Sequence, residues 1–343
     1  MVELRRELKR SSFETKGKVT ERTIDLRQDP LTGLTCRIIE KDVNIGPKGD
    51  FSEIIEQPQC PFCEARLETH TPKAAPSGGL ADRIRVGDTV LVPNLFPYAD
   101  HCGVLVFKDH FTEMGKFRVE EICNGLLACR DFIRAVQRHD RAAVHASINW
   151  NYMNPSGGTL IHPHLQALAD ARPTHLQRLM FEGARRYPNY WKELLEQETK
   201  DGERHVTDIG KVHLLTPFAP MGHDEVTGIL EGRFILSEMT ECDANDLAEA
   251  IMAVQCYYQH LGRNSLNMAM MGSAATTGAS GSDERRLWVS FRIVARSNLV
   301  KFYRSDASFM ERLHLECVTS RAPEMTAKAF RVFLGPKKNK RTG

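Results

Sequence analysis

One order of segments occurs twice along the chain, and this repetition limits the folds that are open to it. Each half has strand-like segments, an apolar-periodic helix, a further strand, a loop of small residues and a final strand. In the first half we expect strands at Val86–Pro93, Gly103–Lys108 and Val144–Trp150 and a helix over Val119–Gln137. In the second half we expect strands at Thr227–Ile235, Leu266–Met271 and Leu287–Val294 and a helix over Ala244–Leu261. The pattern predicts an α+β fold of two repeats, each an antiparallel sheet flanked by helix.

The two repeats set the expected domain limits. Residues 1–170 hold the first repeat with an N-terminal extension, 171–210 a connector that contains a helix, 211–335 the second repeat, and 336–343 a basic tail. A chain of 343 residues can bury the core of such a doubled fold.

Composition narrows the class of partner. The formal net charge is +2 and 26% of the residues are charged, so no strong overall field favours nucleic acid or an anionic membrane. We expect a small-molecule substrate instead. Nine cysteines, in a chain that begins MVELRRELKR without an apolar signal segment, predict a reducing and cytoplasmic location.

The segment Gly157–Gln166, GGTLIHPHLQ, carries the clearest chemical signal. If it forms a strand edge, His162, His164 and Gln166 share one face, because side chains alternate along a strand. In the second half the matching stretch at 288–292 reads WVSFR and has no histidine. The second repeat is therefore expected to be degenerate, with catalysis in the first. Two imidazoles and an amide after a small-residue loop indicate a phosphoryl-binding site with a histidine nucleophile.

The CPFC sequence at residues 60–63 supplies two soft ligands from one turn, and a tetrahedral zinc site needs two more. A redox pair and a simple buried pair are the alternatives for such a CxxC. The context favours zinc, because no thioredoxin-like βαβ pattern surrounds it. The histidines considered for the other two positions are His70, His101, His110 and His162. His110, at the end of an expected strand, is the best third ligand, and with His162 as the fourth the site would be closed and structural.

Several motifs together resemble the galactose-1-phosphate uridylyltransferase branch of the histidine-triad superfamily, with its ADP-glucose and dinucleoside-polyphosphate phosphorylase relatives. They are DPLTG at 29–33, CPFC at 60–63, VPNLFPYADH at 92–101, FKDHF at 107–111, and Asn151 followed by GGTLIHPHLQ. The resemblance implies two histidine-triad-like repeats, a homodimer, and zinc on Cys60, Cys63, His110 and His162. It makes His164 the nucleophile and Gln166 the holder of the phosphoryl oxygens. It places Asn151, Gly157 and Thr159 at the phosphate, and Asn94 and Phe96 at the nucleoside.

The residue types support the same chemistry. A neutral imidazole can attack the α-phosphorus of a nucleoside diphosphate derivative and form a nucleotidyl-histidine, which divides one displacement into two. The backbone amides of Gly157 and Gly158, the Thr159 hydroxyl and the Gln166 amide are donors for the phosphoryl oxygens. Because Gln166 cannot act as a base, transfer to a sugar 1-phosphate or inorganic phosphate is favoured over hydrolysis. The alternatives are a non-catalytic, zinc-stabilised nucleotide-binding or regulatory protein and a nucleotide-conjugate hydrolase.

The chain also departs from the uridylyltransferase pattern. Uridylyltransferases with a second metal use histidines in the second half, and the matching stretches at 271–274 and 288–293 have none, so we expect no second metal. The nucleoside segment reads Asn94-Leu95-Phe96, closer to the phosphorylases. The hexose-binding stretch aligns loosely with 301–306 and lacks the Tyr-Glu pair, so galactose specificity is unsupported. For His213 and His223 we expect ordinary core or surface roles.

Overall fold

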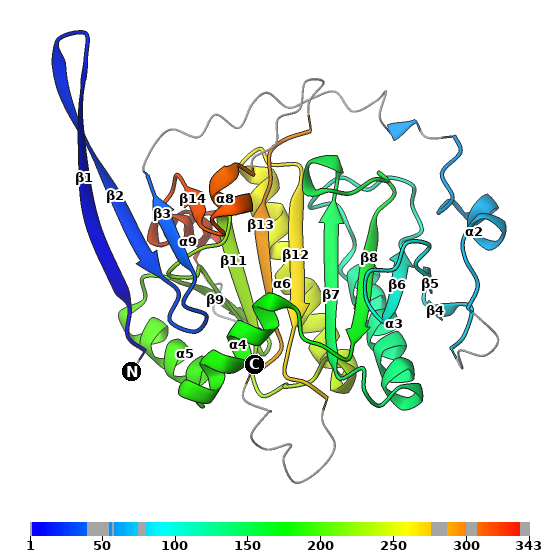
Figure 1. The fold of residues 1–343 in the computed structure, drawn as a ribbon. Coiled ribbons are helices and arrows are strands. Elements are labelled where there is room, and N and C mark those ends of the chain that lie inside the picture. The colour runs from blue at the N-terminus through cyan, green and yellow to red at the C-terminus, as the bar shows by residue number, and fades with distance from the viewer. Residues whose placement is uncertain are drawn as a thin grey trace.

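The computed structural model describes residues 2–39, 55–56, 58–74, 80–275, 287–299 and 307–336. Within these residues the strands form one ten-stranded sheet and one four-stranded sheet (Figure 1). The small-residue loop of the second repeat from residue 276, the stretch 301–306 and the basic tail from residue 337 lie outside the described residues.

The two repeats lie side by side in the larger sheet, whose order is β4-β5-β6-β8-β7-β12-β13-β11-β10-β9. The first half contributes β4 (Ile84–Val86), β5 (Thr89–Pro93), β6 (His101–Val106), β7 (His145–Tyr152) and β8 (His164–Asp170). The second half contributes β9 (His205–Ile209), β10 (Val212–Leu215), β11 (His223–Leu230), β12 (Leu266–Met271) and β13 (Ser290–Ala295). Each pair of neighbours is antiparallel. The two halves meet where β7 pairs with β12, and from there outward each half has its strands in the corresponding order. The predicted α+β fold of two repeats is confirmed, with both antiparallel sheets joined into one.

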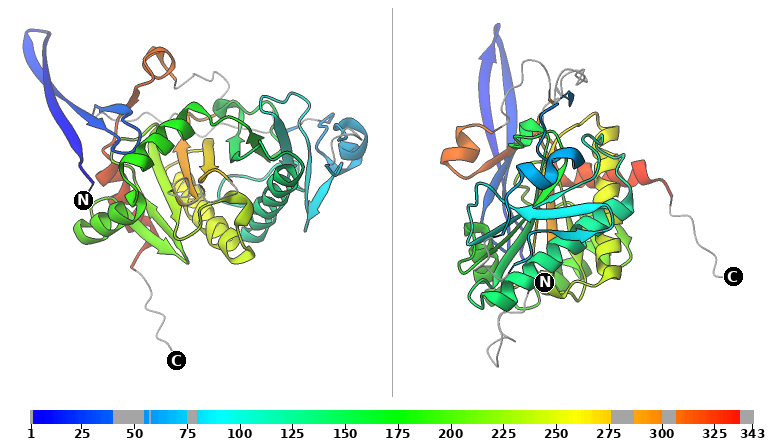
Figure 2. Two further views of the ribbon diagram at one scale, coloured as in Figure 1. Left: turned by 60° about the horizontal axis from the view of Figure 1, so that its bottom comes forward. Right: turned by 90° about the vertical axis from the view of Figure 1, so that its right-hand side faces the viewer.

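Two long helices cover one face of this sheet (Figure 2). They are α3 (Val119–His139) of the first repeat and α6 (Glu241–His260) of the second. On α3, Ile122, Leu126, Cys129 and Ile133 recur at helical spacing and are fully buried. They share a core with the alternate strand residues Leu165, Ala167 and Ala169 of β8. The even-numbered residues of β8, among them His164 and Gln166, therefore point to the opposite face.

The connector between the repeats packs on that opposite face, over the second half of the sheet (Figure 1). It contains two helices, α4 (His175–Arg186) and α5 (Tyr190–Asp201), where one was expected. Met180, Trp191 and Leu194 contribute from these helices to a cluster that includes Leu215 and Ile229 of the sheet. None of the described helices has the length and apolar content needed to cross a bilayer.

The smaller sheet has the order β1-β2-β3-β14 and joins the two ends of the chain. Its strands are β1 (Arg5–Thr15), β2 (Lys18–Gln28), β3 (Thr35–Ile38) and β14 (Cys317–Thr319). The β1–β2 hairpin projects from the body of the protein (Figure 2). The remaining helices are α2 (Glu64–His70), α8 (Phe309–Leu313), α9 (Pro323–Leu334) and the short 3₁₀ turns η2 (Asn154–Ser156) and η3 (Leu236–Glu238).

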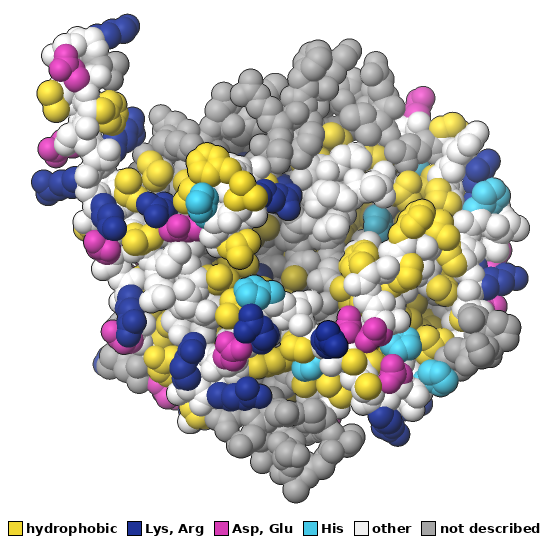
Figure 3. Space-filling model, viewed as in Figure 1, with side chains coloured by type: hydrophobic (Ala, Val, Ile, Leu, Met, Phe, Trp, Pro, Cys, Tyr) yellow, Lys and Arg dark blue, Asp and Glu magenta, His cyan; other side chains and the backbone are white. Residues whose placement is uncertain are grey.

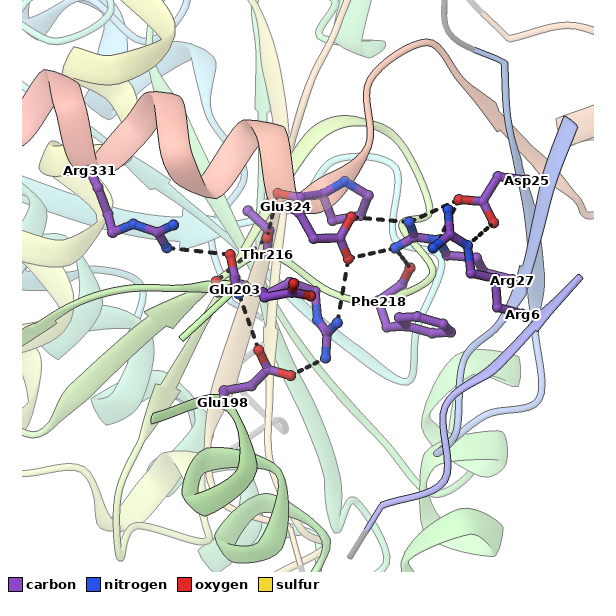
Figure 4. Close-up of polar contacts among 11 residues, drawn as sticks. Arg6, Asp25, Arg27, Glu198, Glu203, Thr216, Phe218, Glu324 and Arg331 are labelled. Carbon is purple, nitrogen blue, oxygen red and sulfur yellow. Dashed lines mark hydrogen bonds and ion pairs between the residues drawn. The ribbon is translucent and has the colours of Figure 1, made fainter. Parts of the chain in front are cut away.

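A buried ion-pair network fastens the base of the hairpin to the second repeat (Figure 4). Arg27, 2% exposed, donates to Asp25 and to Glu324 of α9, the latter at 2.7 Å. Arg204 bridges Glu324 and Glu198 of α5. Burial alone would raise the pKa of Glu324, but its hydrogen bond and charge contact with Arg27 hold the pKa below the usual value. Charges that share partners in this way tolerate burial that a single charge would not.

Candidate active site

Four side chains from three separate segments of the first repeat converge, two of them just after β6 and just before β8. Cys60, Cys63, His110 and His162 each place one ligand atom within 4.8 Å of the others. Cys63 Sγ lies 3.2 Å from His110 Nδ1, and the two thiols lie 3.6 and 3.9 Å from His162 Nδ1. Tetrahedral zinc, with its usual sulfur and nitrogen bond lengths, requires sulfur–nitrogen separations of about 3.6 Å. The four residues therefore have the types and the spacing of a closed metal site.

The backbone fixes which nitrogen of each histidine faces the thiols. His162 Nε2 lies 2.8 Å from the Phe107 carbonyl oxygen, and His110 Nε2 lies 2.8 Å from the Ile55 carbonyl oxygen. A carbonyl oxygen only accepts, so both Nε2 atoms carry the proton and both Nδ1 atoms present a lone pair to the cluster. Such outer hydrogen bonds orient metal-binding histidines. The other two histidines considered lie elsewhere, since His101 pairs with Asp140 and His70 with Thr69.

His164 begins strand β8 directly after this cluster. The strand was expected from Gly157, but residues 157–163 form a loop, and Pro163 without an N–H precedes the first strand residue. His164 is 7% exposed, and its Nδ1 donates to the His162 carbonyl oxygen at 2.9 Å. Burial lowers the pKa of His164, and the hydrogen bond to His162 opposes this only in part. The ring is thus a neutral imidazole whose Nε2 lone pair is available as a nucleophile.

Gln166 lies two residues further along the same face of β8. Its side-chain oxygen accepts a hydrogen bond from the Tyr98 hydroxyl. This contact occupies the oxygen of the amide, whose NH₂ group can donate two hydrogen bonds. Tyr98 belongs to the loop between β5 and β6 and is 62% exposed, so it reaches across the surface to the amide. This contact sets the orientation of the group that was expected to hold phosphoryl oxygens.

The loop between β7 and β8 forms a small-residue turn next to Asn151. Gly157 has a φ of 91°, a left-handed conformation that favours glycine. A Cβ on Gly158 would lie 3.1 Å from the backbone oxygens of Asn151 and Met153, so the loop approaches the end of β7 closely. Thr159 is exposed. The structure thus places Gly157, Gly158 and Thr159 in one loop between β7 and the strand of His164, close to Asn151 of β7.

Asn151 is held by a residue of the second repeat. Asn267 of β12 pairs with it in register and donates from Nδ2 to Asn151 Oδ1 at 2.6 Å and to the Ser156 backbone oxygen at 2.8 Å. Arg296 in turn donates to Asn267 Oδ1. The degenerate repeat therefore supports the loop of the first repeat without supplying a histidine.

The residues expected at the nucleoside occupy the β5–β6 loop. Asn94 Oδ1 accepts from the Phe96 amide at 3.0 Å, which closes a tight turn. Leu95, Phe96 and Tyr98 are 64%, 77% and 62% exposed, an unusual display of apolar surface for one loop. Figure 3 shows hydrophobic side chains gathered on this face on the side of the first repeat. Tyr98 links this loop to the strand of His164 through its hydrogen bond to Gln166.

The chain was compared with protein families, with known sequences and with solved structures. No protein-family model matches the chain. An uncharacterised protein of Archaeoglobus fulgidus is 30% identical over 338 residues, which cover 96% of this chain and 98% of that protein. The chain belongs to the same family as this archaeal protein.

Solved structures give the fold. An ADP-glucose phosphorylase from Arabidopsis thaliana, solved with bound ADP-glucose, superposes with a TM-score of 0.70 at 17% identity, covering 90% of this chain and 98% of that one. A GalT-like protein from Arabidopsis thaliana superposes with a TM-score of 0.67 at 17% sequence identity, and the match covers 89% of this chain and 98% of that one. A uridylyltransferase superposes with a TM-score of 0.57 at 18% sequence identity, and the match covers 90% of this chain and 98% of that one. The chain therefore has the fold that these three proteins share, in agreement with the resemblance of its motifs.

In this uridylyltransferase-like fold, three residues near the nucleophile were not singled out from the sequence. Phe62, the third residue of CPFC, has its ring centroid 5.4 Å from that of His164 and 5.9 Å from that of His162. Tyr98 and Asn267 contact Gln166 and Asn151. The only sequence signal for Phe62 and Tyr98 is their place inside the CPFC and NLFPYADH motifs, and none marks Asn267.

Proposed function

We propose that the protein is a nucleotidyltransferase that works through a nucleotidyl-His164 intermediate. The observation that carries the proposal is the hydrogen bond from His164 Nδ1 to the His162 carbonyl oxygen, which leaves Nε2 of a buried, neutral ring as the attacking atom. The donor is a nucleoside diphosphate sugar or a similar nucleotide. The acceptor is a sugar 1-phosphate or inorganic phosphate. The bound ADP-glucose of the Arabidopsis phosphorylase supports this donor class by its fold relationship.

The reaction divides into two displacements. His164 Nε2 bonds to the α-phosphorus, and the bond between this phosphorus and the bridging oxygen breaks, which releases the distal phosphate with the bond electrons. The imidazole becomes a phosphorylated imidazolium, and its Nδ1–H still donates to the His162 carbonyl. An oxygen of the acceptor phosphate then attacks the same phosphorus, and the phosphorus–nitrogen bond breaks to regenerate neutral His164.

Charge on the phosphoryl oxygens needs donors that are fixed in advance. The Gln166 NH₂ is one such donor, because the hydrogen bond from Tyr98 holds the oxygen of the same amide. The Gly158 amide, Asn151 and the Thr159 hydroxyl lie in or beside the adjoining loop and are proposed for the same role. The Gly157 amide, which was also expected there, instead donates to the Asn154 backbone oxygen at 2.9 Å. Gln166 has no basic group to activate water, so the intermediate passes to a phosphate acceptor in preference to hydrolysis.

We propose that zinc occupies the cluster of Cys60, Cys63, His110 and His162 as a structural ion. Two thiolates and two imidazoles in tetrahedral spacing are a zinc donor set. Bound zinc would supply no open position, because side chains fill all four. It would fix His162, and through the His162 carbonyl it would fix the ring of His164.

Labelling with an alkaline denaturing quench tests the nucleophile, because the phosphorus–nitrogen bond of a nucleotidyl-histidine survives in alkali and hydrolyses in acid. The protein is mixed with ADP-glucose, UDP-glucose or a dinucleoside tetraphosphate labelled at the α-phosphate, and the denatured protein is assayed for acid-labile label. We expect label on the wild type and on His139→Ala, which changes an exposed histidine of α3, and none on His164→Ala. Inorganic phosphate or a sugar 1-phosphate should then discharge the label. Turnover by His164→Ala at the wild-type rate would overturn the proposal.

A further inference from the structure

A second cluster of metal-ligand side chains lies on the β9–β10 hairpin, at the far edge of the larger sheet. His205 Nε2 lies 2.7 Å from Asp208 Oδ1, and His213 Nδ1 lies 2.9 Å from the same oxygen. The three ligand atoms fall within 4.8 Å of one another. A register shift between Leu214 and Leu215 lets His205 share this side of the hairpin with Asp208. Strand pairing thus brings the three together from a nine-residue span of sequence that has no metal-binding motif.

Glu231, just after β11, completes the arrangement. Its Oε2 lies 3.3 Å from His213 Nε2, on the far side of the ring from Asp208. When Nε2–H donates to Glu231, a neutral ring turns its Nδ1 lone pair toward Asp208. A lone pair facing a carboxylate is repulsive unless the ring takes up a second proton or a metal cation lies between them. A carboxylate behind the outer nitrogen of a histidine is the usual support of a metal-binding imidazole.

We propose that His205, Asp208 and His213 bind a divalent first-row transition-metal ion, with Glu231 as the outer hydrogen-bond acceptor. Two imidazoles and one carboxylate are a donor set for zinc, cobalt, nickel and iron. At bond lengths near 2.1 Å, adjacent positions of an octahedron are about 3.0 Å apart. The separations of 2.7 and 2.9 Å are therefore close to what a shared ion requires.

This site is separate from the Cys/His cluster and from the stretches at 271–274 and 288–293. It departs from the sequence-based expectations of no second metal and of an ordinary role for His213. Six strand spacings separate β9 from β8, which bears His164, or about 29 Å at about 4.8 Å per strand. The ligand side chains are reachable from solvent, with His205 18%, His213 22% and Asp208 42% exposed. An ion there would tie β9 to β10 at the sheet edge and, through Glu231, to β11.

Metal stoichiometry tests the site independently of activity. Protein is exposed to excess zinc, freed of unbound ion by gel filtration and analysed by elemental mass spectrometry. We expect two equivalents per chain for the wild type. Asp208→Asn and the His205→Ala/His213→Ala double variant should each retain one, and Cys60→Ser should lose the other. Glu231→Gln should weaken binding at the hairpin roughly 10- to 100-fold by calorimetric titration. His139→Ala serves as the matched histidine control and should retain both.

Cobalt loading separates the two sites in one sample, because only the Cys60 and Cys63 thiolates give a sulfur-to-metal charge-transfer band. The hairpin variants should keep this band while losing one equivalent of cobalt. If the double variant does not fold, Asp208→Asn, which keeps the side-chain shape, decides the question. The proposal is overturned if the wild type binds no more metal than the His205→Ala/His213→Ala double variant, or if its zinc isotherm is identical to that of Asp208→Asn.

Discussion

His164 donates its Nδ1–H to the backbone oxygen of His162 across 2.9 Å, while the side chain of His162 belongs to the Cys/His cluster. The proposed nucleophile and the proposed metal ligand are thus joined through one peptide unit. A change in the metal site should reach the nucleophile by this route, because the ring of His164 has its orientation set by that carbonyl.

Cys60→Ser should therefore impair both metal binding and transfer. Loss of a ligand of a closed structural site is expected to cost about 4 kcal/mol or more of unfolding free energy. Metal analysis should find that the zinc of the Cys/His cluster is missing, and labelling of His164 should fall in parallel. Cys242→Ser, which changes an exposed cysteine outside the cluster, is the control and should alter neither. Full metal content in Cys60→Ser would remove Cys60 from the ligand set.

Tyr98→Phe should slow transfer without disturbing the fold. The variant loses only the hydroxyl that donates to Gln166 Oε1, so the amide is free to rotate. A hydrogen bond worth about 1 kcal/mol corresponds to a roughly five-fold change. We expect the loss in kcat with little change in KM for the donor, because the amide acts on the charge that develops in transfer.

Steady-state kinetics with the donor found by labelling makes this measurement. Tyr187→Phe removes an equally small group from a partly exposed tyrosine outside the site and should leave both constants unchanged. A rise in KM alone for Tyr98→Phe would assign Tyr98 to donor binding and contradict its positioning role.

Asn267→Ala should reduce transfer although Asn267 lies in the repeat that lacks the histidines. The variant leaves Asn151 Oδ1 and the Ser156 backbone oxygen without their shared donor. Two lost hydrogen bonds of about 1 kcal/mol each predict a roughly 30-fold fall in kcat/KM. Asn245→Ala, on an exposed part of α6, is the control. Unchanged kinetics in Asn267→Ala would show that the loop between β7 and β8 does not depend on the second repeat for its proposed role.

Glu324→Gln should lower stability at neutral pH by about 3 kcal/mol, since it leaves Arg27 and Arg204 with one carboxylate fewer in a buried network. The pKa of Glu324 is lowered in the folded state, so its contribution is complete above the unfolded value of 4.5 and is lost as pH falls through the folded value. Urea unfolding at about pH 7 and at about pH 4 measures this. The deficit of the variant should shrink at the lower pH.

Glu182→Gln is the control for this comparison, because the Glu182–Arg178 pair is exposed and should contribute little at either pH. A deficit for Glu324→Gln that is equal at the two pH values would contradict the assigned role of its charge.

Much of the fold could be predicted because its signals are local. The apolar spacing of α3 and α6 and the alternation in β7 and β12 repeat in both halves, and a doubled pattern points to a doubled fold. The start of β8 was placed too early, because alternation of polar residues cannot distinguish a strand from the loop that leads into it. Pro163 and the left-handed Gly157 mark that loop.

The sequence by itself determined which side chains are candidates for the chemistry: the thiols of CPFC and the imidazoles and amide of HPHLQ. It also determined that the second copy of that strand has no histidine. Only the tertiary structure decided which distant residues orient these side chains. Tyr98 and Gln166 are 68 residues apart, and Asn151 and Asn267 are 116 apart. His205, Asp208 and His213 meet through a hairpin with a register shift. The physical reason is that such contacts depend on strand register and loop path, which follow from packing of the whole sheet and leave no local period in the chain.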